Sequence, residues 1–212
     1  MIFCFKYTRL PRKTIVTNIL ILSDKLPEKT NRSPDGEGAT GGAYLLRLTV
    51  RRPLRVVFGR FRGGQPIVVP AGECLYVGSA MGGLGRRLVR HATRTGDRPP
   101  HAIRAEMLAR FPAAGLGDDL LPRRGKSLRW HVDYLLDETA VVLRAVLLLR
   151  SPRRLEKPLA HLLQTDPHTF PLAPGLGAGD SPGSTHLLGV RAPETWWASL
   201  PERLNTLLEE SP

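Results

Sequence analysis

Residues 74–91 combine the side chains best suited to chemistry on a phosphodiester. Residues 74–78 form a short apolar stretch that includes Tyr76, and a glycine-rich segment then leads to Arg87, Arg90 and His91. A guanidinium can pair with a phosphate through two parallel hydrogen bonds. A strand that delivers a tyrosine and a basic helix to one place is therefore a candidate phosphodiester site.

Hydrolysis of a phosphodiester requires three roles to be filled. The attacking water must be activated, charge on the phosphate must be stabilised, and a hard cation is usually held by few carboxylates so that substrate phosphates complete its shell. Tyr44 and Tyr76 are candidates for the first role, and Arg87 is the candidate for the second. Glu156, a lone carboxylate at an arginine-rich helix start, is the candidate for the third.

A plainer interpretation of each residue stays open. Strand tyrosines often place only their hydroxyl at the surface, and the arginines of residues 86–90 can form a solvated helix face. Glu156 can pair with Arg153 or Arg154 at the surface, an interaction that contributes little to stability. Single histidines are more often structural than catalytic. Residue type alone does not decide between the two interpretations.

Other site motifs are missing where they would be expected. The glycine-rich turn at residues 78–85 lacks the Lys-Ser/Thr pair of a P-loop and the G-x-G-x-x-G spacing of a dinucleotide site. Cys4 and Cys74 lie far apart, without a second cysteine or a histidine at metal-ligand spacing. We therefore expect neither a zinc site nor a disulfide framework.

The chain is strongly basic, with 31 Lys and Arg against 19 Asp and Glu and a formal net charge of +12. Such a charge favours polyanionic partners, above all nucleic acid, although an arginine-rich composition can also reflect a GC-rich genome. No apolar run reaches the roughly 18–20 residues that cross a bilayer, and the N-terminus lacks a signal-peptide pattern. We expect a cytoplasmic protein with no membrane partner.

Hydrophobic periodicity predicts the elements that position these residues. Four short strands joined by tight turns are expected to form an antiparallel meander, at residues 44–50, 54–58, 66–70 and 74–78. A helix at residues 83–93 has an apolar stripe for the sheet, and Arg87, Arg90 and His91 fall on a neighbouring face.

The remaining pattern predicts an α/β (α+β) fold, a small and mainly antiparallel sheet flanked by helices. Residues 112–126 and 165–185 are expected to be loops. The other expected elements are a helix at 101–111, a helix start at 130–136, a strand at 140–149, a helix from about 152, a strand at 186–190 and a helix at 193–209.

Residues 1–40 differ in composition from the rest of the chain. They hold four of the six lysines and end in a polar, glycine-rich stretch that is typical of a flexible linker. We expect residues 1–40 to be a basic extension that is disordered or loosely ordered, and residues 41–212 to form a single domain.

Several ordered blocks resemble the GIY-YIG nuclease superfamily. Gly42-Ala-Tyr44 and Tyr76-Val-Gly78 correspond to the two tripeptides of its name, and Arg87 corresponds to the key arginine of its first helix. More narrowly, the chain is similar to the domain of unknown function 123 branch, known also as a fusion to some endonuclease III proteins. Further blocks of that branch match at residues 130–135, 155–157 and 175–187.

The resemblance implies a metal-dependent endonuclease that acts on nucleic acid, DNA more than RNA. Tyr76, together with Tyr44, would act on the attacking water, while Arg87 would stabilise charge on the phosphate. Glu156 would hold a single Mg²⁺ or Mn²⁺ ion. Six further residues match positions of the branch without a defined role and are expected to support the site or contact the nucleic acid: Arg90, His91, His131, Asp133, Asp180 and His186.

The chain also departs from the branch. Lys157 stands where the branch has a cysteine, and Ser181 and Gly183 stand where it has a closing pair of cysteines. A metal or a disulfide that uses those cysteines is not available to this chain. Two other functions stay open: a catalytically inactive nucleic-acid-binding module of the same fold, and a structural or interaction domain whose charge reflects genome composition.

Overall fold

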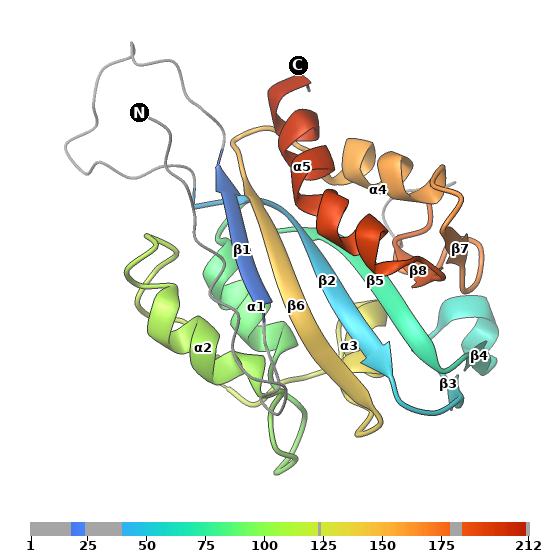
Figure 1. Cartoon of the computed structure of the whole chain (residues 1–212). Helices are drawn as coiled ribbons and strands as arrows, with labels where there is room; N and C mark the ends of the chain where they lie inside the picture. Colours follow the sequence, from blue (N-terminus) through green and yellow to red (C-terminus); the bar gives the residue numbers. More distant parts are fainter. Residues whose placement is uncertain (1–17, 24–39, 123, 179–183, 211–212) are drawn as a thin grey trace.

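A six-stranded mixed sheet organises the computed structural model of the chain, which describes residues 18–23, 40–122, 124–178 and 184–210 (Figure 1). Helices cover the sheet, so the predicted α+β class is confirmed. The strands follow one another across the sheet as β1 (Asn18–Ser23), β6 (Val141–Arg150), β2 (Gly42–Val50), β5 (Gly72–Ser79), β8 (Leu187–Val190) and β7 (Thr169–Pro171).

Strand β2 lies near the middle of the sheet because both of its faces are apolar. Tyr44 and Leu46 point into one hydrophobic core, whereas Ala43 and Leu45 point into another on the opposite face. Successive side chains of a strand alternate between faces, so a strand that is apolar throughout must be covered on both sides. This two-sided burial fixes the register of β2 against its neighbours β5 and β6.

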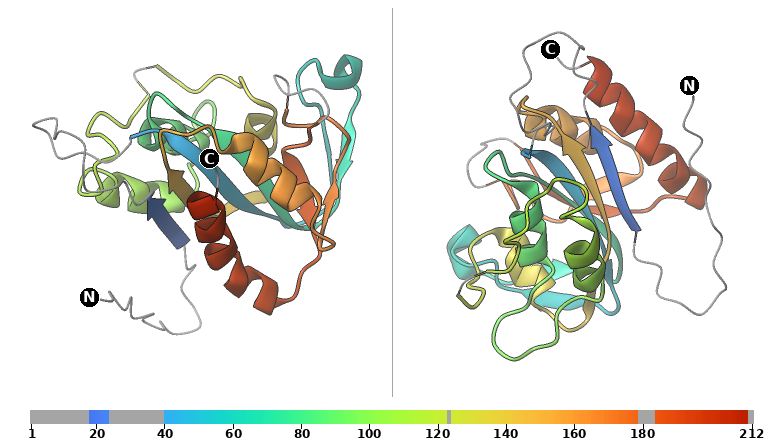
Figure 2. Two further views of the ribbon diagram at one scale, coloured as in Figure 1. Left: turned by 90° about the horizontal axis from the view of Figure 1, so that it is seen from above. Right: turned by 90° about the vertical axis from the view of Figure 1, so that its left-hand side faces the viewer.

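Five helices supply the two covering layers within the described residues (Figure 2). The first core is closed by α1 (Leu84–His91), α2 (Ile103–Arg110) and α3 (His131–Leu136), and the second by α4 (Glu156–Gln164) and α5 (Glu194–Glu210). Leu84, Leu88 and Ala92 are fully buried, which confirms the predicted apolar stripe. None of the helices in the described ranges is long and apolar enough to cross a membrane.

The predicted four-stranded meander is wrong in its pairing. Strands β2 and β5 pair directly, with Tyr44 opposite Gly78, while β3 (Leu54–Val56) and β4 (Ile67–Val69) pair only with each other in a separate two-stranded ribbon. Two long strands share more hydrogen bonds with each other than either could share with a three-residue strand. The residues between them therefore form a separate ribbon, whose inner face packs on the first core.

Two segments predicted to be unstructured contain strands. Strand β7 lies inside the predicted loop at residues 165–185 and pairs with β8. Strand β1 lies inside the predicted extension and runs parallel to β6 at the sheet edge. The remainder of that extension, residues 1–17 and 24–39, lies outside the described residues, and a domain boundary near residue 41 stays a prediction.

Helix α1 packs so closely on the 112–120 loop that one of its positions has no room for a side chain. A Cβ atom on Gly85 would lie 2.3 Å from the backbone oxygen of Leu116 and 2.8 Å from the Leu120 side chain. Glycine in a helix normally costs about 1 kcal/mol relative to alanine. Here the missing side chain permits the close contact that fixes the position of α1, and with it that of Arg87.

We predict that Gly85→Ala destabilises the protein, although the same change in an exposed helix would stabilise it. Overpacking against backbone should lower the free energy of unfolding by about 1–3 kcal/mol, measured by chemical denaturation. Gly82→Ala, where nothing lies within 4 Å of the added Cβ, is the matched control and should be nearly neutral. Equal stability of Gly85→Ala and the wild type would contradict this packing.

Candidate functional site

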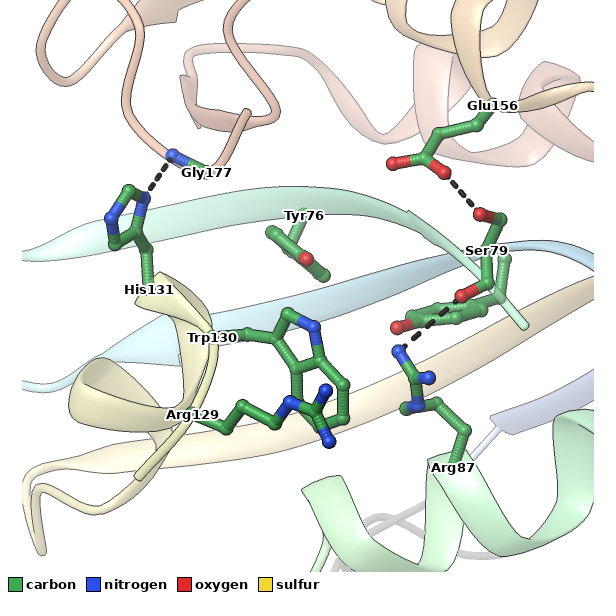
Figure 3. Close-up of a pocket in the computed structure, with 9 residues that line it drawn as sticks. Tyr76, Ser79, Arg87, Arg129, Trp130, His131, Glu156 and Gly177 are labelled. Atoms are coloured by element: carbon green, nitrogen blue, oxygen red, sulfur yellow. Dashed lines mark hydrogen bonds between the residues drawn. The ribbon is translucent and has the colours of Figure 1, made fainter. Parts of the chain in front are cut away.

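A cavity of about 290 Å³ opens between the sheet and the elements around it (Figure 3). The four residues predicted to act together, Tyr44, Tyr76, Arg87 and Glu156, all line it. They come from β2, β5, α1 and the first residue of α4. Four elements far apart in the sequence therefore meet at one pocket. Its other lining residues are Ser79, Arg129, Trp130, His131 and Gly177.

The absence of a side chain at Gly78 lets Tyr44 reach the pocket. Because Gly78 lies opposite Tyr44 in the β2–β5 ladder, a Cβ there would come within 2.5 Å of the Tyr44 ring and hydroxyl. The Tyr44 ring lies across this bare backbone instead, with its centroid 6.3 Å from that of Tyr76. The two tyrosines thus occupy one wall of the pocket.

Tyr44 is the outer end of a buried chain of hydrogen bonds. Its hydroxyl lies 2.8 Å from Nε2 of His91, and Nδ1 of His91 lies 3.1 Å from Oδ1 of Asp133. All three side chains are almost fully buried. We refer to Tyr44, His91 and Asp133 as the relay. The sequence placed His91 beside the arginines of α1, but the structure turns its ring into the core.

The direction of these hydrogen bonds follows from the charge state of each group. Burial lowers the pKa of His91 to about 4, against the opposing effect of Asp133, so the imidazole is neutral near pH 7. An ionised carboxylate only accepts hydrogen bonds. Nδ1 of His91 therefore carries the ring proton and donates a hydrogen bond to Asp133. Nε2 is then an acceptor, and the Tyr44 hydroxyl donates to it.

Asp133 is held as an anion in spite of its burial. Burial raises its pKa, but His91, Lys126 and the Trp130 N–H more than offset this, and the pKa lies well below its ordinary value. Arg90 Nη1 donates to both carboxylate oxygens, at 3.1 and 2.9 Å, and the N–H groups of Arg129 and Trp130 donate to Oδ2 at 3.0 Å each. Lys126 Nζ lies 3.6 Å from Oδ1.

Arg87 is positioned by an aromatic ring and a carbonyl. Its guanidinium lies 3.8 Å from the centroid of the Trp130 ring, a cation–π contact, and Nη1 donates to the backbone oxygen of Ser79 at 3.4 Å. Figure 3 shows Arg87 on the same side of the pocket as Ser79 and Glu156. Within the described residues Arg87 forms no ion pair, so its charge is available to an anion in the pocket.

Glu156 is the only carboxylate among the described residues that line the pocket. The Ser79 hydroxyl donates to Oε2, and His186 Nδ1 lies 3.1 Å from Oε1. Burial raises its pKa, but His186 and Ser79 outweigh that effect, and the pKa of Glu156 lies below its ordinary value. The carboxylate is therefore ionised at neutral pH. Its side chain is 24% exposed, so it remains accessible from the pocket.

Tyr76 differs from Tyr44 in its surroundings. Burial and the nearby Tyr44 raise the pKa of Tyr76 well above its ordinary value. Its hydroxyl has no hydrogen bond to the part of the chain that the structure describes, whereas Tyr44 donates to His91. Of the two tyrosines, Tyr44 is thus the one with a proton acceptor behind it.

The other predicted site residues have distinct places. Arg90, His91 and Asp133 lie behind the pocket wall and His186 lies against Glu156. His131 lines the pocket and accepts a hydrogen bond from the Gly177 N–H at 3.0 Å, and burial lowers its pKa. Asp180, together with Ser181 and Gly183, lies outside the described residues.

Four lining residues were not predicted as site residues: Ser79, Arg129, Trp130 and Gly177. Ser79 lies in the block that begins with Tyr76, and Trp130 in the block that contains His131 and Asp133, so their position beside predicted residues was the available signal. Stacking of an arginine on Trp130 has no signature in the sequence. It becomes visible only once α1 and α3 are packed together.

The model of one protein family, described as a domain of unknown function, DUF123, matches residues 43–208 of the chain. No curated protein and no solved structure matches it. The family match begins in β2 and ends in α5, so it includes every described residue of the pocket.

The neutral, buried histidines predict a loss of stability in mild acid. Burial lowers the pKa of His91 to about 4 and that of His101 to about 3, below the ordinary 6.5 of the unfolded chain. Between pH 6.5 and 4 the unfolded chain therefore binds more protons than the folded one, and stability falls as pH falls. Each histidine should contribute a slope of roughly 1 kcal/mol per pH unit near pH 5.5.

Chemical denaturation at half-unit steps from pH 6.5 to 5 measures that slope. Acidic groups with a lowered pKa, such as Asp133, contribute mainly below this window, because their unfolded pKa lies near 4. In His91→Asn, stability should still fall with falling pH, but the slope should be smaller by the contribution of one histidine, roughly 1 kcal/mol per pH unit. An unchanged slope in this variant would show that His91 is already protonated in the folded protein.

Proposed function

The chain belongs to the DUF123 family, and we propose that it is a divalent-metal-dependent endonuclease of the GIY-YIG superfamily. The observation that carries the proposal is the convergence of Tyr44, Tyr76, Arg87 and Glu156 on one pocket. These side chains match the motif residues of the superfamily and suit the three roles of phosphodiester hydrolysis. A structural domain has no need to bring them to an accessible cavity.

Nucleic acid is the proposed substrate, and DNA is preferred over RNA because the similar branch includes fusions to endonuclease III proteins. The net charge of +12 supports a polyanionic substrate. Among the described residues that line the pocket, two are arginines, Arg87 and Arg129, and one is a carboxylate, Glu156. We assign the activity to the cytoplasm, a reducing compartment that suits the free, buried thiol of Cys74.

In the proposed mechanism, the relay activates the attacking water through Tyr44. Tyr44 is not ionised by itself at neutral pH, because burial raises its pKa well above the ordinary value against the lowering effect of Arg87. It can nevertheless pass its own proton to the neutral Nε2 of His91 while it accepts one from water. Asp133 stabilises the imidazolium that results, as the aspartate does in a Ser-His-Asp triad.

Arg87 has the role of stabilising charge that develops on the phosphate. Stacking on Trp130 and the hydrogen bond to Ser79 hold the guanidinium in place before the substrate binds. Donors that are oriented in advance need no reorganisation during the reaction. We assign Tyr76 to orientation of the water or phosphate through its hydroxyl, since no described base lies behind it.

Glu156 is the residue that would hold one Mg²⁺ or Mn²⁺ ion. Among the described residues no group of three or more acidic, histidine or cysteine side chains is arranged around a common point. A single ionised carboxylate is nevertheless enough for Mg²⁺, which keeps several waters and takes substrate phosphates as ligands. When bound, such an ion would polarise the phosphate and neutralise its charge. Ser79 and His186 keep Glu156 ionised and oriented for that role.

We predict that the full chain nicks supercoiled plasmid with Mg²⁺ or Mn²⁺ and loses this activity in a chelator. Arg87→Ala should lower the rate by about 10²–10³-fold, as expected for loss of one oriented donor, and Glu156→Gln should abolish the metal-dependent reaction. Arg86→Ala is the matched control, because Arg86 directly precedes Arg87 in α1 and pairs with Asp119 at the surface. It should stay within about twofold of the wild type.

The same assay separates the alternatives. A wild type that binds plasmid in a salt-dependent way without nicking it would be a catalytically inactive binding module. Equal activity of the wild type, Arg87→Ala and Glu156→Gln would point to a contaminating nuclease and reject the proposed site.

The relay makes a second prediction, about the dependence of the rate on pH. Because the pKa of His91 is lowered to about 4, its neutral form is already complete at pH 5.5. The nicking rate should therefore show no inflection near 6.5, the ordinary histidine value. Tyr44→Phe should lower the rate by roughly 10²–10⁴-fold while DNA binding is kept. A break near pH 6.5, or full activity of Tyr44→Phe, would exclude the relay.

A further inference from the structure

The connection between β2 and β5 carries charge of one sign only. Residues 51–72 contain five arginines and no Asp, Glu, Lys or His. Residues 51–69 of this connection, including β3 and β4, are called the basic ribbon. Its arginines are all exposed, and none forms an ion pair with the described residues: Arg51, Arg52, Arg55, Arg60 and Arg62.

Several other exposed arginines of the molecule are paired, unlike those of the basic ribbon. Arg86, Arg98 and Arg110, for example, are also exposed but have a carboxylate partner. Unpaired like charges that lie close together repel one another, so a cluster of this kind is destabilising by itself. A polyanion bound to the ribbon would relieve that repulsion.

The outward face of the ribbon combines charge with small apolar side chains. Arg55 lies opposite Val68 in the β3–β4 ladder, and Val57 and Val68 are 45% and 58% exposed. The aromatic residues face the other way. Phe58 is fully buried, and Phe61 packs against the first core.

The basic ribbon is fixed to the wall of the pocket. Phe61 packs edge-on against His131, with ring centroids 5.2 Å apart, and His131 lines the cavity. Gly59, with φ of 59°, lies where any Cβ would come within 2.7 Å of the Tyr134 hydroxyl. Both contacts are to α3, the helix that also carries Asp133 of the relay. The ribbon therefore has a set position relative to the pocket.

The pocket has two ends, and the ribbon adjoins only one of them. Figure 3 shows Ser79, Arg87 and Glu156 at one end and His131 and Gly177 at the other. Because Phe61 contacts His131, the basic ribbon continues the pocket beyond the end that is farther from Arg87 and Glu156. A nucleic acid with its scissile phosphate at Arg87 would reach the ribbon with a flanking segment.

We propose that the basic ribbon binds the phosphate backbone of a DNA duplex that flanks the scissile phosphate. The inference rests on the proposed nuclease function. It specifies that the substrate has double-stranded DNA beside the bond that is cleaved. A two-stranded ribbon fits the major groove of DNA, where valine side chains can contact apolar base atoms while the arginines pair with phosphates. Single strands are bound through exposed aromatic rings, and the ribbon turns its two aromatic residues inward.

Binding without cleavage tests the proposal independently of the activity. The full chain is titrated in chelator against a labelled 20-base-pair duplex, and against one of its strands, at several salt concentrations. Arg55→Gln/Arg60→Gln should weaken duplex binding by about tenfold at moderate salt. Loss of two phosphate contacts should also reduce the slope of log K against log salt by roughly 2.

A double variant with the same change of charge is the control. Arg110→Gln/Arg203→Gln removes two arginines from α2 and α5, each of which pairs with a carboxylate away from the pocket. This control should keep the salt slope and the affinity of the wild type. Thermal melting of both variants checks that each is folded.

Each result decides one question. Equal losses of affinity in the two double variants, a loss confined to the single strand, or no duplex binding by the wild type at low salt would overturn the proposal. Duplex binding that depends on the ribbon, in a protein that nicks no plasmid, would leave the ribbon contact standing and reject the nuclease function instead.

Discussion

A single buried carboxylate, that of Asp133, joins the parts of this molecule on which the proposed chemistry depends. It accepts hydrogen bonds from His91 and Arg90 of α1 and from the backbone at the start of α3, and Lys126 lies close by. An anion is costly to bury unless it is surrounded by donors and cations, and removal of one partner of such a pair costs about 3–5 kcal/mol. Asp133 thus holds α1 against α3 and keeps His91 in one tautomer.

The same arrangement accounts for the different positions of the cations around the pocket. Arg90 and Lys126 are committed to Asp133, whereas Arg87, one turn of α1 before Arg90, is directed into the cavity and rests on Trp130. A helix that presents one arginine inward and one to the pocket can serve both structure and chemistry. Residues three apart lie on the same side of a helix, and both guanidinium groups lie over the Trp130 ring. The ion pair with Asp133 is what gives Arg90 its separate role.

Local patterns in the sequence predicted the elements whose faces are strongly apolar, such as β2, α1 and the long strand β6. They failed where structure depends on a distant partner: β1 and β7 are short edge strands that exist only because β6 and β8 are there to pair with them. The four motif residues of the pocket were predicted to act together, and they do line one cavity. The contact of Tyr44 with His91 was not predicted, because it requires β2 and α1 to be packed together.

The direct pairing of β2 with β5 separates the residues of the pocket from the charged surface of the connection between these strands. Because these two strands fix Tyr44, Tyr76 and Gly78 by their own ladder, the exposed arginines of the connection between them can change without moving those residues. The exposed positions of the connection are therefore sites where evolution, or a protein engineer, can change the charge of this surface and leave the pocket in place.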